Sequence, residues 1–162
     1  MADVVRSGPR KDLAAVRPRR ETALIKRRND DLWIGATALA ASMLALPLAQ
    51  SSWHGPEAAA VLAIAATSML AGQRWAIAVV VLAELLLLPT VWPRAFALSS
   101  ETLPRLAAFG ALFALVPGVL AMRRAAAAMV LVTGVRRTRR VCRRFQIALI
   151  AIGLIATLMP IL

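Results

Sequence analysis

The sequence predicts an all-α protein: a polytopic transmembrane helical bundle of about five spans with its N-terminus inside the cell. A basic amphipathic helix at the membrane interface is expected before the last span. Three observations lead to this fold class. The apolar runs approach the ~20 residues that a helix needs to cross a bilayer. Lys and Arg residues are sorted between alternate gaps, and tryptophans stand at the ends of the runs.

The composition is that of a membrane protein of single-domain size. Hydrophobic residues make up 60% of the 162 residues, and the mean hydropathy is +0.70. The net charge of +12 would suit nucleic acid, but the cations flank the apolar runs, where orientation signals belong. We therefore expect a lipid bilayer with anionic headgroups as the partner of these cations, and no nucleic acid.

The basic residues orient the chain. Eighteen of the twenty Lys and Arg residues fall in gaps on one side of the expected membrane, and only Arg94 and Arg105 fall in the others. Cytoplasmic loops carry the excess of cations. The expected location is therefore the bacterial cytoplasmic (inner) membrane, with a multi-pass chain, a cytoplasmic N-terminus and a periplasmic C-terminus. The inside cations are Arg6, Arg10, Lys11, Arg17, Arg19, Arg20, Lys26, Arg27, Arg28, Arg74, Arg123, Arg124, Arg136, Arg137, Arg139, Arg140, Arg143 and Arg144.

The apolar runs also divide the chain into regions. Residues 1–31 are expected to form a flexible basic cytoplasmic arm, because they are polar and Pro18 would interrupt any long helix. Residues 32–122 are expected to form a four-span membrane bundle, residues 123–144 a cytoplasmic or interfacial basic segment, and residues 145–162 a C-terminal span. The expected spans are Leu32–Gln50, Glu57–Gly72, Trp75–Trp92, Arg105–Met122 and Phe145–Leu162.

The tryptophans support the first three of these spans independently of charge. Trp prefers the two membrane–water interfaces. Each of the four lies at an expected span end: Trp33, Trp53, Trp75 and Trp92.

The basic segment contains two stretches of different character. Ala125–Gly134 is apolar but too short to cross as a helix, so it is re-entrant, interfacial or an extension of the fourth helix. Val135–Phe145 has the pattern of an amphipathic helix with an apolar face and a cationic face. Its cations either set orientation alone or bind anionic lipid or an acidic partner. These cations are Arg136, Arg137, Arg139, Arg140, Arg143 and Arg144.

Glu84 is the one charged residue between Arg74 and Arg94, at the centre of the third expected span. A charge at this depth costs on the order of 2.5–3.5 kcal/mol, so the carboxyl is expected to face the bundle interior and to spend part of its life protonated. At about 1.5 Å per residue, three hydroxyl residues reach a similar depth: Ser42, Thr67 and Ser68. Such a cluster suits either a proton or ion site or a structural network between helices.

Small residues mark a packing surface on the fourth span. Gly110, Ala114 and Gly118 recur every four residues and form a smooth ridge on which another helix can approach closely. The approaching helix belongs to the same chain, to another membrane subunit or to a second copy in a homo-oligomer.

No set of catalytic or metal-ligating residues emerges from the sequence. His54 is the single histidine and Cys142 the single cysteine, and no Gly-rich phosphate loop is present. No catalytic residue, metal or cofactor is expected. We expect a non-enzymatic integral membrane protein, an accessory or assembly subunit of a bacterial inner-membrane complex. Two alternatives are a small proton-coupled transporter or channel component using Glu84, and a membrane scaffold that docks on anionic lipid.

Overall fold

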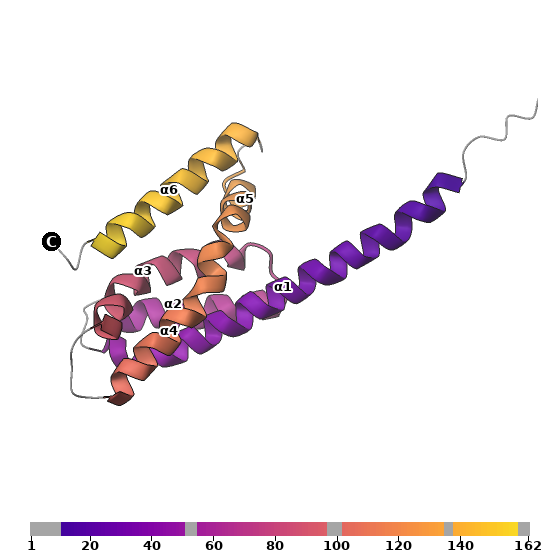
Figure 1. Ribbon diagram of the computed structural model, residues 1–162. Coiled ribbons are helices and arrows are strands. Elements are labelled where there is room, and N and C mark those ends of the chain that lie inside the picture. Colours follow the sequence, from indigo (N-terminus) through magenta and orange to yellow (C-terminus); the bar gives the residue numbers. More distant parts are fainter. Residues whose placement is uncertain (1–10, 51–54, 97–101, 135–137, 159–162) are drawn as a thin grey trace, which may run out of the picture.

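The structure is a computed structural model that describes residues 11–50, 55–96, 102–134 and 138–158. These residues form six α-helices and no strand (Figure 1). The helices are α1 (Lys11–Ala49), α2 (Gly55–Leu70), α3 (Ala76–Phe96), α4 (Thr102–Leu120), α5 (Met122–Val132) and α6 (Arg139–Leu158). Four of them contain a stretch long and apolar enough to cross a membrane, namely α1, α3, α4 and α6. The apolar helix α2 is shorter, at 16 residues.

Helices α1 to α4 form a four-helix core. Both α1 and α3 pack against α2 and α4, and they also contact each other across the diagonal. Much of the buried surface is alanine, including Ala38, Ala41 and Ala45 of α1 and Ala59 and Ala66 of α2. Small side chains let the helix backbones approach closely, which is how helices gain packing contacts in a lipid environment.

A second, smaller cluster joins α5 and α6 to α3. It consists of Val81 and Leu85 of α3, Ala125 and Ala126 of α5, and Leu149 of α6. Within the described chain, α6 packs on α3 and α5 alone. Only 6% of the apolar stretch of α6 is buried, against 56% of that of α3. Therefore α3 is the central helix of the fold and α6 is the most peripheral one.

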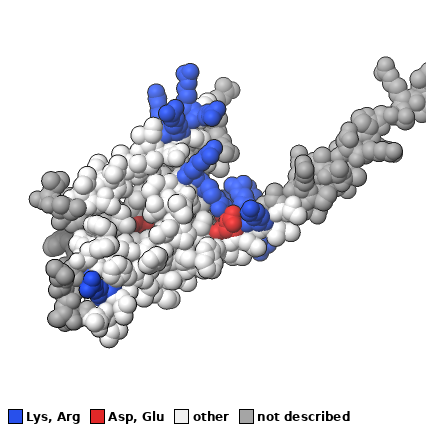
Figure 2. Space-filling view, viewed as in Figure 1, with Lys and Arg blue, Asp and Glu red and all other residues white. Residues whose placement is uncertain are grey.

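The helices alternate in direction, so that their ends gather at two ends of the bundle. The C-terminal ends of α1, α3 and α6 and the N-terminal ends of α2 and α4 share one end, on the left in Figure 1. The α2–α3 turn, α5 and the start of α6 lie at the other end. Among the described cations, Arg94 and Arg105 stand at the first end and the others at the second. Figure 2 shows the resulting separation of blue side chains.

The turn between α2 and α3 is where the sequence predicts a reversal, and its geometry is specific. Gly72 has φ +89°, a conformation that costs glycine nothing and strains other residues. The Gly72 N–H donates to the Met69 carbonyl at 2.9 Å, and the Gln73 N–H donates to the Ser68 carbonyl at 3.1 Å. This pair of bonds is a Schellman motif, which satisfies the last carbonyls of α2 and presents Arg74 and Trp75 at the start of α3.

Helix α1 begins much earlier than expected. It starts at Lys11 and continues through Pro18 into the first apolar stretch, so the part of the expected arm from residue 11 onward is helical. A proline within a helix costs about 3 kcal/mol. The residues around Pro18 include Ala, Leu and Arg, which are strong helix formers and add little further cost. The N-terminal half of α1 projects away from the bundle (Figure 1), and residues 24–30 are exposed.

Residues 125–134 fall mostly in α5, which is a separate helix and not an extension of α4. The chain bends at Ala121, whose N–H still donates to the carbonyls of Pro117 at 3.1 Å and Gly118 at 2.9 Å. Near the start of α5, Arg124 donates a hydrogen bond to the Asp31 carboxylate of α1 and forms an ion pair with it. This ion pair and the packing on α3 direct α5 across the end of the bundle.

The basic residues before the last span open α6 itself, in place of the separate interfacial helix that the sequence predicts. Thr138 precedes the helix, and its Oγ1 accepts a hydrogen bond from the Val141 N–H at 3.3 Å. This N-cap sets the start of α6 at Arg139. No Gly or Pro occurs between Arg139 and Ile152, so one helix continues from the arginines into the apolar stretch. Arg136 and Arg137 lie outside the described residues.

Candidate functional site

Glu84 lies at the centre of α3 and is fully buried. Its neighbours along the helix, Val80, Val81 and Leu85, are buried as well. On the facing helix α4, a Cβ built on Gly118 would overlap the Glu84 carboxyl group. The carboxyl therefore packs directly against the backbone of α4, in space that any larger residue at position 118 would occupy.

The carboxyl group has no hydrogen-bond partner for either oxygen among the described residues. An ionised carboxylate buried without a partner costs several kcal/mol. The uncharged acid is the form that this environment accommodates, because it avoids the cost of an unpaired buried charge. The site is therefore a buried contact between two helices.

The hydroxyl residues predicted to accompany Glu84 are bonded elsewhere. Ser42 is buried, and its Oγ donates to the Leu39 carbonyl of its own helix at 2.7 Å. Thr67 and Ser68 both donate to the Ile64 carbonyl, at 2.8 Å and 2.9 Å. Thr67 is exposed on the outside of α2. The structure therefore does not join these groups and Glu84 into a hydrogen-bonded network.

The small-residue ridge on α4 is used within the chain at two positions. Gly118 faces Glu84 of α3, and a Cβ on Gly110 would lie 3.2 Å from Leu44 Cδ1 of α1. Ala114, between them, is partly buried against the core. The ridge therefore brings α4 against both α1 and α3.

The basic residues at the start of α6 keep the facial division that the sequence predicts. The four described arginines are exposed, while Val141, Cys142 and Phe145 on the other face are partly buried. Phe145 packs on the cluster shared by α3, α5 and α6. The apolar face is therefore covered by protein, and the cationic face points away from it. The four arginines are Arg139, Arg140, Arg143 and Arg144.

The sequence did not predict two of the contacts in the structure. The first is the pairing of Glu84 with Gly118, because depth along a span does not specify how each helix is rotated about its axis. The second is the ion pair between Asp31 and Arg124. A signal for this pair was present, since Asp31 precedes the first expected span and Arg124 follows the fourth, which puts both at the same boundary.

Among the described residues, no three or more His, Cys, Asp or Glu side chains gather into a group that could hold a metal ion. Compared with protein-family models, with curated proteins and with solved structures, the chain has no match.

The contact between Glu84 and Gly118 can be tested through the free energy of unfolding of two variants. We expect Gly118→Ala to destabilise the fold by about 1–3 kcal/mol, the usual cost of overpacking, because the new methyl group overlaps the carboxyl. Adding Glu84→Ala should recover most of this loss. Reversible unfolding in mixed detergent micelles measures both.

Gly110→Ala is the matched control, because its methyl group would meet only the end of the flexible Leu44 side chain. Equal losses for the two glycine variants, or no recovery in the double variant, would contradict the assigned contact.

Proposed function

We propose that this chain is a non-enzymatic integral protein of the bacterial inner membrane that serves as an accessory or assembly subunit of a larger membrane complex. The observation that carries the proposal is the buried contact of Glu84 with Gly118. An ionisable group within a span is a candidate for transport when it faces a water-filled cavity. Here the group is used between two helices, which supports a role in packing and assembly.

The membrane location rests on the helices and on the ends of the bundle. Four helices are long and apolar enough to cross a bilayer. The end that carries most of the described arginines would face the cytoplasm, in keeping with the excess of cations in cytoplasmic loops. We therefore expect the start of α1 on the cytoplasmic side and the end of α6 on the outer side.

The outer face of α6 is the surface that we assign to a partner subunit. This helix has two neighbours in the described chain, and large apolar side chains such as Ile147, Leu154 and Leu158 remain more than half exposed. Ala151 lies among them and is exposed as well. A small residue between larger ones offers a partner helix a place for close approach.

A small proton-coupled transporter or channel component is the second candidate. The observation in its favour is that neither Glu84 oxygen has a hydrogen-bond partner among the described residues. A relay would need polar neighbours, but Ser42, Thr67 and Ser68 each donate to a carbonyl of their own helix. We therefore rank transport below assembly.

Orientation is tested by labelling introduced cysteines in a Cys142→Ser background. Gln73→Cys lies in the exposed α2–α3 turn and Thr102→Cys at the exposed start of α4. A membrane-impermeant maleimide should label position 102 in spheroplasts and position 73 only after permeabilisation. The reverse pattern would invert the orientation, and labelling of both positions before permeabilisation would contradict a spanning bundle.

The assembly role is tested by extracting the tagged chain from native membranes with a nanodisc-forming polymer. We expect migration as a larger complex that Ala151→Trp disrupts, because the indole would occupy the close approach on α6. Val116→Trp, at an exposed position of α4, is the matched control and should leave the complex intact. A parent chain that always migrates alone would refute the proposal.

The ranking of the two candidates is tested by proton flux in proteoliposomes. We expect no proton flux that depends on Glu84, because the carboxyl is enclosed by packed helices. The Glu84→Gln variant should therefore behave like the parent. Glu57→Gln, at the exposed start of α2, controls for the loss of a carboxylate elsewhere. A parent flux that only Glu84→Gln removes would promote the transporter above the assembly subunit.

A further inference from the structure

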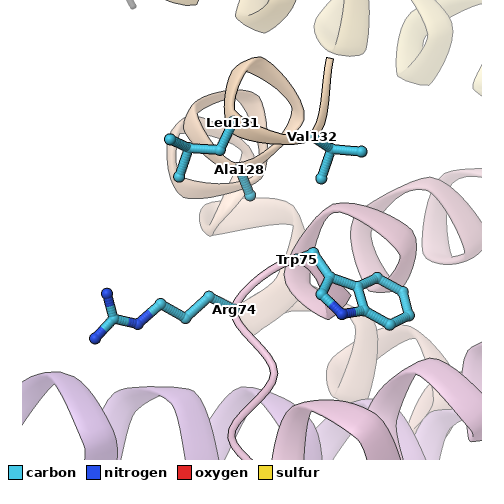
Figure 3. Close-up of a pocket in the computed structure, with 5 residues that line it drawn as sticks. All are labelled: Arg74, Trp75, Ala128, Leu131 and Val132. Atoms are coloured by element: carbon cyan, nitrogen blue, oxygen red, sulfur yellow. The ribbon is translucent and has the colours of Figure 1, made fainter. Parts of the chain in front are cut away.

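A pocket of about 260 Å³ lies at the cation-rich end of the bundle, between the α2–α3 turn and α5. It is lined by Arg74 and Trp75 on one side and by Ala128, Leu131 and Val132 on the other (Figure 3). The lining thus combines one cation, one indole and three apolar side chains. It is separate from the arginines of α6 that the sequence singles out.

Hydrogen bonds at the helix ends and core packing hold both walls of the pocket in place. On one wall, the Schellman turn at Gly72 leads into Arg74, and the Ala78 N–H donates to the Trp75 carbonyl at 3.0 Å. On the other, α5 is held against α3 by Ala125 and Ala126. Thr133 closes the end of α5 by donating from Oγ1 to the Met129 carbonyl at 2.9 Å. The pocket is therefore built by backbone hydrogen bonds and core packing, without requiring a ligand.

Four of the five lining side chains are open to the surroundings, and Ala128 is buried. Trp75 is 48% exposed, Leu131 is 63% exposed and Val132 is 67% exposed. Arg74 is exposed too and forms no ion pair with any described carboxylate. In Figure 3 the Arg74 guanidinium and the Trp75 indole extend to opposite sides of the turn, and Leu131 and Val132 lie across from them. A ligand that contacts all of them must carry an anionic group and hydrocarbon together.

Phospholipid has this chemistry. A guanidinium pairs with phosphate oxygens in a bidentate geometry, and Trp prefers the headgroup level of a bilayer, where its indole meets both hydrocarbon and water. Basic pockets between helices at the cytoplasmic side suit lipid headgroups. Exposed cations at the same end of the bundle, such as Arg123, Arg139 and Arg140, add a positive potential that favours a headgroup of net negative charge.

We propose that this pocket binds one anionic phospholipid, with Arg74 on the phosphate and with Trp75, Leu131 and Val132 against the upper acyl chain. The lipid then fills the space between the α2–α3 turn and α5 and couples the position of α5 to the membrane surface. The proposal rests on the membrane location proposed above, and it adds a site that neither the assembly role nor the arginines of α6 require.

The test uses Trp75 as the reporter. A Trp33→Phe, Trp53→Phe, Trp92→Phe background leaves it as the single tryptophan of the chain, reconstituted in phosphatidylcholine vesicles with a minor fraction of phosphatidylglycerol. One of the two lipids carries bromine on its acyl chain and quenches nearby indole fluorescence. We expect brominated phosphatidylglycerol to be about fivefold enriched beside Trp75 over its share of the bilayer, the effect of one cation near an anionic surface.

The variants separate charge from folding. Arg74→Gln should remove the enrichment, whereas Arg74→Lys should keep most of it, because the cation is retained. Arg105→Gln removes an exposed cation at the other end of the bundle and should leave the enrichment unchanged.

Two results would overturn the lipid site while leaving the membrane location standing. The first is quenching in proportion to bulk composition in the parent, and the second is an enrichment that Arg74→Gln does not alter. Absence of quenching by either brominated lipid would instead contradict the membrane location itself, and the lipid site with it.

Discussion

The central position of α3 is the constraint on which the rest of the fold depends. This helix contacts each of the other five helices in the described chain. Its neighbours must therefore come close, and glycine makes this possible at two points. Gly118 of α4 leaves space for the Glu84 carboxyl, and a Cβ on Gly153 of α6 would lie 3.1 Å from Leu85 Cδ2. A central helix with a polar group at its middle thus fixes which faces of α4 and α6 are turned inward.

A second constraint limits the polar side chains along the apolar helices. In hydrocarbon, each backbone or side-chain polar group needs a partner within the protein. Ser42, Thr67 and Ser68 satisfy their hydroxyls on carbonyls of their own helices, which needs no neighbour at all. Neither oxygen of Glu84 has a hydrogen-bond partner among the described residues, and the carboxyl group lies against α4. Its role in our proposal, a packing group between helices, follows from this difference.

Charge organises the cation-rich end of the molecule in two ways. Arg124 is held by Asp31 and ties α5 to α1, so it acts within the chain. Arg74 and the described arginines of α6 are exposed, and in our proposals they are available to a headgroup or an acidic partner. The distinction depends on one nearby carboxylate, because an arginine beside an aspartate at the boundary is neutralised internally, whereas one without such a neighbour keeps its charge for the surroundings.

The sequence by itself determined the helical class, the positions of α2, α3 and α4 within a few residues, the turn at Gly72 and the assignment of cations to the two ends of the bundle. These properties follow from hydropathy, glycine chemistry and charge, which act along the chain. Local rules predicted an interruption at Pro18 and a separate helix before the last span, but α1 continues through Pro18 and α6 begins after the Thr138 cap. Only the tertiary structure decided that Glu84 meets Gly118, that Asp31 meets Arg124, and that Arg74 and Trp75 share a pocket with α5. The physical reason is that packing against other helices sets the rotation of each helix about its axis and the bend at Ala121. Hydropathy along the chain does not specify either of them.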